Sequence, residues 1–68
     1  MNEIKINTEI IKLDAFLKWA AIAQSGSEAK FFIQDGLVSV NNEICLQRGK
    51  KLVKGDIVSF EGSDYKIV

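Results

Sequence analysis

The spacing of the apolar residues changes at Gly36, and this change constrains the fold more than any other feature of the chain. Before Gly36 the apolar residues recur every three or four positions, whereas beyond it they alternate with polar residues, as in Val38-Ser39-Val40. The first spacing is typical of amphipathic helices and the second of half-buried strands. The sequence therefore predicts an α+β fold in which two packed helices are followed by a small, mainly antiparallel sheet.

The first helix is expected to begin at Leu13. Asp14 would lie in its first turn, where a negative charge interacts favourably with the helix dipole. One apolar stripe continues along the helix as far as Ala23. Its members are Leu13, Phe16, Leu17 and Ala20, and Trp19 and Ala23 widen it.

The second helix has clear signals at both ends. Ser25-Gly26-Ser27-Glu28 has the S-x-x-E pattern of a capping box, in which the first and last residues satisfy each other's free N–H groups. Gly36 is suited to the left-handed conformation that ends a helix. The link between the helices is short, so we expect them to pack as neighbours. The buried stripe of this helix is Ala29, Phe32 and Ile33.

Strands are expected on both sides of the helix pair. Glu3–Asn7 alternates polar and apolar residues and is expected to form an edge strand. Asn41-Asn42 is suited to a hairpin turn, because asparagine tolerates a positive φ. Gln47–Lys54 is expected to be a polar, basic loop around Gly49. Further strands are expected at residues 38–40, 43–46, 57–60 and 65–68, with turns at 55–56 and 61–64.

Length and composition limit what the chain can do. Its 68 residues are 47% hydrophobic, which suits one small domain over residues 1–68 that buries roughly 60% of its unfolded surface. Cys45 is the only cysteine and histidine is absent, so no intrachain disulfide and no usual zinc site can form. No cofactor is expected, and a reduced, cytoplasmic location is favoured. There is no signal-peptide pattern and no apolar run near the roughly 20 residues that span a bilayer, so no membrane contact is expected.

Charge is unevenly distributed although the nine basic and nine acidic residues balance. Residues 1–11 carry one basic and two acidic residues, a net charge of −1. Residues 12–54 carry seven basic and four acidic residues, a net charge of +3, and residues 55–68 carry one basic and three acidic residues, a net charge of −2. The basic middle indicates a possible anionic partner, such as nucleic acid.

Four cations lie within the expected loop, namely Arg48, Lys50, Lys51 and Lys54. Cations spaced along a loop can meet successive phosphates and release their counterions, and arginine can bind a phosphate through two N–H groups. A solvated polar loop without any ligand is the plain alternative.

A second candidate surface lies on the second helix. Ser27, Lys30 and Gln34 stand at positions i, i+3 and i+7 and share one face. Lys30 could meet a phosphate there, while Ser27 could donate a hydrogen bond. A polar outer face without a ligand explains the same residues. Lys18 is less informative, because it could simply pair with Asp14 four residues earlier.

Four short motifs follow one another along residues 12–60. They are Lys12-Leu13-Asp14-x-x-Leu17, Ser27 opening a helix, Ile33-x-x-Gly36-x-Val38-x-Val40-Asn41, and Gly55-Asp56-x-Val58. In this order and spacing they resemble the S-four RNA-binding domain, whose fold is also called the alpha-L motif. Residues 16–18, 25–30 and 48–52 are similar to the small, single-domain bacterial branch of that family.

The resemblance implies a protein that binds structured RNA, mostly ribosomal or transfer RNA, through its helix pair and the adjacent loop. A role in ribosome assembly or translation is part of this implication. Glu28 stands where larger members of the family carry arginine, and Asn42 stands where glycine is usual. The RNA-binding residues that we expect are Lys12, Ser27, Lys30, Gln34, Arg48, Lys50, Lys51 and Lys54.

Catalysis and small-molecule substrates are not expected. Asp14, Glu28, Asp35 and Asp56 each have a structural explanation at a helix end or a turn, and no nucleophile stands beside a base. Cys45 lies among apolar residues and is expected to act as a small core side chain.

A protein-interaction adaptor without RNA contact stays open as the alternative function. It would use Trp19 or Phe31 as an apolar anchor. Phe31 neighbours Lys30, so stacking on an unpaired base is another interpretation of this residue. Salt dependence separates the two functions, because RNA binding weakens steeply with salt and apolar docking does not.

Overall fold

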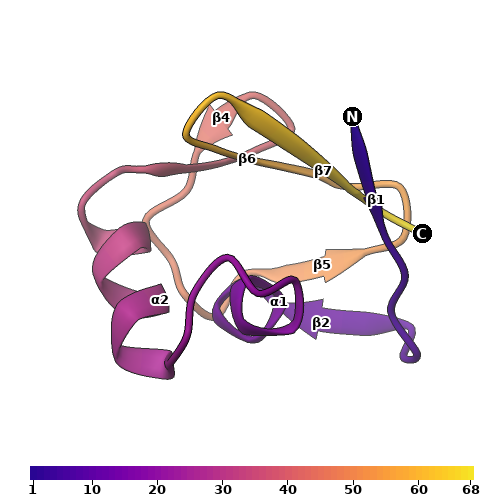
Figure 1. Ribbon diagram of the computed structural model, residues 1–68, viewed down its shortest axis with the longest axis horizontal. Coiled ribbons are helices and arrows are strands. Elements are labelled where there is room, and N and C mark those ends of the chain that lie inside the picture. The colour runs from indigo at the N-terminus through magenta and orange to yellow at the C-terminus, as the bar shows by residue number, and fades with distance from the viewer.

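The chain folds into two layers that face each other across one core (Figure 1). The computed structural model describes residues 1–68. One layer is a five-stranded sheet with the strand order β1-β7-β6-β3-β4, and the other holds two helices and a ribbon of β2 and β5. The helices are α1 (Leu13–Trp19) and α2 (Gly26–Gln34). The strands are β1 (Asn2–Ile4), β2 (Ile10–Lys12), β3 (Val38–Val40), β4 (Glu43–Ile44), β5 (Lys51–Val53), β6 (Ile57–Phe60) and β7 (Ser63–Ile67).

The five-stranded sheet confirms the expected mainly antiparallel arrangement. β3 pairs with β4 and β6, and β6 pairs with β7, all antiparallel. β1 is the edge strand at one side, as expected, and it runs parallel to β7 with Ile4 opposite Ile67. The α+β fold with an N-terminal edge strand is therefore confirmed.

The hairpin between β3 and β4 turns at Asn41-Asn42, as expected. Asn41 has a φ of +51° and Asn42 a φ of +70°. Positive φ at both central residues is the geometry of the type I′ turn, whose twist matches that of the flanking strands. The hairpin is short, because β4 ends at Ile44, and Cys45 lies half-buried just beyond it.

Asn41 and Asp56 join two turns that are distant in the sequence. The Asn41 Nδ2 donates to Asp56 Oδ1 at 3.1 Å, and the Ile57 N–H donates to Asn41 Oδ1 at 2.9 Å. The other carboxylate oxygen of Asp56 accepts from the Val53 N–H at 2.9 Å. These contacts tie the hairpin turn to the turn between β5 and β6, so these two motif residues have a structural role.

The capping box at the start of α2 is present with one difference. Ser25 Oγ accepts from the Glu28 N–H at 3.1 Å, as expected. The Glu28 carboxylate reaches one residue further than expected and accepts from the Gln24 N–H at 3.1 Å. At the other end, Gly36 adopts a φ of +76°, which confirms the left-handed helix stop.

α1 is shorter than the apolar stripe predicts, because it ends at Trp19 and does not extend to Ala23. Ala21 takes a φ of +60°, and the Ile22 N–H then donates to Leu17 O at 2.9 Å. This 6→1 hydrogen bond belongs to the Schellman motif, which closes a helix through a left-handed residue. Ala23 is still buried, with 3% of its surface exposed, because the chain folds back toward the core after the helix.

The ribbon of β2 and β5 was not expected from the sequence. Residues 51–53, assigned to the basic loop, form β5 and pair antiparallel with β2. Ile10 lies opposite Val53 and Lys12 opposite Lys51. Leu52 points inward and is fully buried, which attaches the ribbon to the core.

The core draws on both layers and on the segments that connect them. Phe16, Ile33 and Val58 illustrate this, because they come from α1, α2 and β6 and have no exposed surface. The buried residues are Ile6, Leu13, Phe16, Leu17, Ala23, Ala29, Ile33, Val38, Val40, Leu52, Val58, Phe60 and Ile67, all apolar. No helix has the length and apolar character needed to cross a membrane.

Candidate nucleic-acid interface

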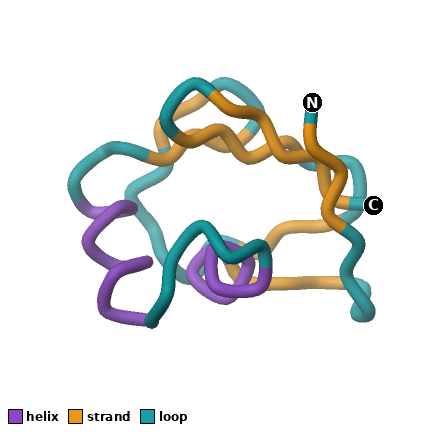
Figure 2. The backbone as a smooth tube through the Cα atoms, in the orientation of Figure 1, coloured by secondary structure: helices purple, strands orange, loops and turns teal.

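The loop between β4 and β5, residues 45–50, runs from the sheet to the helix layer (Figure 2) and is hydrogen-bonded to the start of α1. The first N–H groups of a helix have no partner within the helix. Here the Leu13 N–H donates to Lys50 O at 2.9 Å, and the Asp14 N–H donates to Arg48 O at 3.0 Å. The main chain of Arg48 and Lys50 therefore caps α1, while both side chains remain exposed.

This attachment gives the loop around Gly49 a defined main-chain path. The loop has a hydrogen bond of its own, from the Lys50 N–H to Gln47 O at 3.2 Å, and β5 continues directly from it. A loop that is already ordered loses less conformational entropy when it binds a ligand. The main chain that carries Arg48 and Lys50 is thus held in place before any partner arrives.

Lys12 and Lys51 face each other across the ribbon. They are directly opposite in the β2–β5 register, and both are exposed. Residues in such a position have their Cβ atoms roughly 5 Å apart, and two like charges there destabilise the pair. The pair therefore adds nothing to the stability of the fold, and it places two ammonium groups beside each other at one end of the ribbon.

The structure brings four of the expected residues together at the junction of the ribbon, the β4–β5 loop and α1. Lys12 is the residue that precedes α1, Lys51 is its partner across the ribbon, and the other two cap the helix through their carbonyl oxygens. We call Lys12, Arg48, Lys50 and Lys51 the cationic surface.

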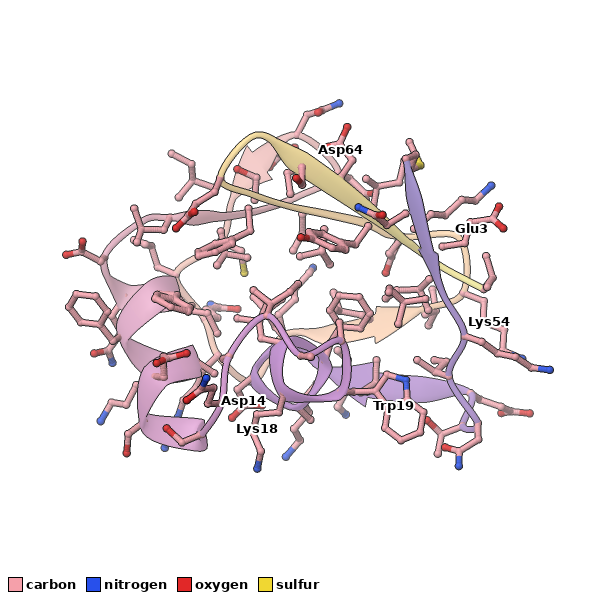
Figure 3. The ribbon with its side chains drawn as sticks, in the orientation of Figure 1. Glu3, Asp14, Lys18, Trp19, Lys54 and Asp64 are labelled. Carbon is pink, nitrogen blue, oxygen red and sulfur yellow. The ribbon has the colours of Figure 1, made fainter.

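Lys54 lies apart from the cationic surface. It follows β5 at the end away from Arg48, and Figure 3 shows it on the side of the molecule where β1 carries Glu3. The structure therefore does not gather all four loop cations, because three residues of extended strand separate Lys54 from Lys50.

The outer face of α2 holds the remaining expected residues. Ser27, Lys30 and Gln34 are all exposed, opposite the buried Ala29 and Ile33. Glu28 lies beside them, but its carboxylate is engaged with the Gln24 N–H. This engagement orients the carboxylate toward the preceding turn.

Lys18 and Trp19 extend from the last turn of α1 (Figure 3). Lys18 is exposed, and Asp14 Oδ1 accepts from the Ala15 N–H at 2.7 Å. The Trp19 indole N–H donates to Lys5 O at 2.8 Å, which fastens the N-terminal segment to α1. Trp19 thus has a structural contact although 52% of its surface is exposed.

An open groove lies between the β3–β4 hairpin and the β4–β5 loop. It combines the exposed apolar side chains of Ile44 and Leu46 with one anion, Glu43, and one cation, Lys50. Sequence reasoning did not anticipate it, because it depends on how the loop leaves the hairpin. Its lining residues are Val40, Asn41, Glu43, Ile44, Cys45, Leu46, Gln47 and Lys50.

The two layers of the molecule differ in charge. The strands of the five-stranded sheet carry three acidic residues and one basic residue, namely Glu3, Glu43, Asp64 and Lys66. The other layer and its loops also carry acidic residues, including Asp14, Glu28 and Asp35, but they hold most of the cations. These cations are Lys12, Lys18, Lys30, Arg48, Lys50, Lys51 and Lys54.

The chain is an α+β protein of the alpha-L type. It has a helix pair with an adjoining cationic ribbon and loop, and these pack against a small sheet. The family model described as "S4 domain" matches residues 4–68. The chain therefore belongs to the S4 domain family, which confirms the S-four resemblance noted in its motifs. A similar protein from Bacillus subtilis (strain 168), described as "Probable ribosome maturation protein RlbA", is 49% identical over 61 residues, which cover 90% of this chain and 86% of that protein.

Proposed function

We propose that this protein binds structured RNA, ribosomal or transfer RNA, through the cationic surface and the outer face of α2. The observation that carries the proposal is the facing pair of Lys12 and Lys51 beside a cationic loop whose main chain is hydrogen-bonded to α1. Membership of the S4 domain family supports it, as does the relative described as a ribosome maturation protein. We propose a role in ribosome maturation or translation on the same grounds.

Phosphate recognition is the mode that these residues suit. Each lysine or arginine that neutralises a phosphate releases counterions, and this release supplies most of the affinity for nucleic acid. Arg48 can hold one phosphate through two N–H groups, whereas Lys12, Lys50 and Lys51 act as point charges. Folded RNA presents phosphates in fixed positions, so a fixed set of cations can recognise its shape.

The proposed activity is binding without catalysis, cofactor or small-molecule substrate. The RNA-binding residues of the proposal are those expected from the sequence, with Lys30, Arg48, Lys50 and Lys51 contributing most. Lys54 would contact a more distant part of the RNA, since it lies at the far end of β5. A cytoplasmic site of action is part of the proposal, in keeping with the free thiol of Cys45.

The experiment is a titration of mixed ribosomal and transfer RNA at two salt concentrations. We would compare the wild type with Arg48→Ala/Lys50→Ala/Lys51→Ala, in which the main-chain contacts to α1 can persist because they use carbonyl oxygens. We would also compare two double variants that lose the same charge. Lys50→Ala/Lys51→Ala removes it from the cationic surface, and the control Lys5→Ala/Lys66→Ala removes it from elsewhere. Circular dichroism checks that each variant is folded.

We expect salt-sensitive binding by the wild type and by Lys5→Ala/Lys66→Ala. The Lys50→Ala/Lys51→Ala variant should bind more weakly, and the slope of log K against log salt should become shallower by about one for each lost phosphate contact. Salt-insensitive binding, or none by the wild type, would contradict the proposal. That result would favour a protein-interaction adaptor, for which the groove beside Ile44 and Leu46 offers an apolar surface.

A further inference from the structure

The outer face of α2 includes one aromatic residue, Phe31. Two pairs on this face are four residues apart, Ser27 with Phe31 and Lys30 with Gln34. Two further pairs are three residues apart, Ser27 with Lys30 and Phe31 with Gln34. Residues at these spacings are neighbours on a helix surface. The four side chains therefore form one contiguous patch, on the side of α2 opposite Ala29.

Phe31 contributes little to the core. Its side chain is 59% exposed, whereas the buried side of α2 is formed by Ala29 and Ile33. Single apolar residues on a surface are common. Phe31 differs from most of them because two of its neighbours at these spacings, Ser27 and Gln34, carry groups that hydrogen-bond nucleotides. Its other two neighbours are Glu28, whose carboxylate accepts from the Gln24 N–H, and Asp35, while Lys30 is the preceding residue on the same outer face.

Phe31 contacts another aromatic ring, which in turn contacts the core. Its ring centroid lies 6.1 Å from that of Phe32 with an angle of 59° between the rings, and Phe32 lies 4.7 Å from Phe60. Phe60 is buried, so a continuous contact leads from the core to the exposed ring. A phenyl group has few rotatable bonds, which limits the entropy lost when a ligand stacks on it.

We infer that Phe31 is a stacking platform for one unpaired base of the RNA. A stacked base places its own phosphate near the ring, where the Lys30 ammonium can neutralise it, and the Gln34 amide can hydrogen-bond an edge of the base. The inference rests on the proposed function and narrows it. The RNA target is then a duplex with a bulged or loop nucleotide beside the phosphates that the cationic surface contacts.

The experiment uses two RNA hairpins of the same stem sequence. One stem is fully paired, and the other contains a single bulged 2-aminopurine, whose fluorescence falls when it stacks on another ring. Binding of each hairpin to the wild type, Phe31→Leu and Phe31→Tyr is measured at one low salt concentration. Ile44→Ala serves as the control, because it shortens an equally exposed apolar side chain outside the patch.

We expect the wild type to prefer the bulged hairpin by roughly five- to a hundredfold, which corresponds to the usual contribution of one base stacked on an aromatic ring. Phe31→Leu should lose this preference and the fluorescence change, yet still bind the paired hairpin like the wild type. Phe31→Tyr and Ile44→Ala should keep the preference.

Two outcomes overturn the inference and leave the proposed function standing. The first is equal binding of both hairpins by the wild type, and the second is an unchanged preference for the bulged hairpin in Phe31→Leu. In either case the proposed function stands if Lys50→Ala/Lys51→Ala weakens binding to the paired hairpin. If the wild type binds neither hairpin, the proposed function and this inference both fail.

Discussion

Asp56 connects the turn after β5 with the β3–β4 hairpin through both of its carboxylate oxygens. Oδ1 accepts from Asn41 Nδ2, and Oδ2 accepts from the Val53 N–H. Asp56→Ala would remove both hydrogen bonds, and because one such bond contributes about 0.5–1.5 kcal/mol net, we expect a loss of about 1–3 kcal/mol in the free energy of unfolding. Urea unfolding measures this loss.

The matched control for Asp56 is Asp35→Ala, which removes an exposed carboxylate at the end of α2. Substitutions on an open surface usually change stability by no more than about 0.5 kcal/mol. A similar stability for the two variants would show that the Asp56 contacts contribute nothing, and that the Gly-Asp motif needs another explanation.

Ala21 adopts a backbone conformation that suits glycine better. Its φ of +60° lies in the left-handed region, which costs an alanine roughly 1–2 kcal/mol. Glycine avoids most of this cost but loses more freedom on folding, so we expect Ala21→Gly to stabilise the protein by about 0.5–1 kcal/mol. Thermal and urea unfolding of the wild type and of Ala21→Gly measure this difference in stability. Destabilisation would mean that the chain does not turn at Ala21 after α1.

The main-chain path of the β4–β5 loop does not require glycine at position 49. Gly49 does not have a positive φ, and a Cβ added to it meets no atom within 4 Å. Gly49→Ala should therefore stabilise the fold by about 0.4–1 kcal/mol, because it restricts the unfolded chain. RNA affinity should stay the same, since the substitution leaves the hydrogen-bonded main chain of the loop unchanged.

Gly55→Ala is the contrasting variant for Gly49. Gly55 has a φ of +100°, so alanine there is strained although space is open around it. We expect this variant to be destabilised. If Gly49→Ala keeps the fold but weakens RNA binding, either the loop must move or the RNA backbone approaches it closely, which would revise the fixed-loop account.

The two helices show why some elements could be predicted and others not. α2 was recognisable because Ser25, Glu28 and Gly36 are local signals that need no knowledge of the fold. The end of α1 was missed because the left-handed position after it holds Ala21, where glycine would have marked the stop. The apolar stripe continued to Ala23, which is buried for tertiary reasons and not as part of the helix.

The β2–β5 ribbon could not be predicted from the sequence for a different reason. Its strands have three residues each, too few for an alternation to be recognised, and they pair across a long stretch of chain. The cations of the candidate site were recognisable from composition. Their arrangement was not, because the pairing of Lys12 with Lys51 and the separation of Lys54 both follow from the ribbon.

The protein has no net charge, so it can attract RNA only if the RNA at the cationic surface is screened from the acidic residues of the other layer. The molecule measures 26 × 20 × 18 Å, and electrostatic interactions through solvent decay over about 8 Å at physiological salt. An RNA held at the cationic surface is therefore screened from acidic side chains on the far layer. Glu3 and Asp64 are such residues, and Figure 3 shows both on the side of the five-stranded sheet.

Glu3→Gln/Asp64→Asn tests this separation, because it raises the net charge by two without touching the cationic surface. Asn at position 64 keeps an oxygen that can accept the Ser59 hydroxyl, which now lies 2.6 Å from Asp64 Oδ1. We expect RNA affinity at about 0.15 M salt to be nearly unchanged, and to rise only when low salt lengthens the screening distance. Lys50→Gln/Lys51→Gln changes the net charge by the same amount in the other direction and should weaken binding at both salt concentrations. If the two variants shift affinity by equal and opposite amounts at physiological salt, then total charge governs the interaction, and the arrangement of Lys12, Lys51 and the loop does not.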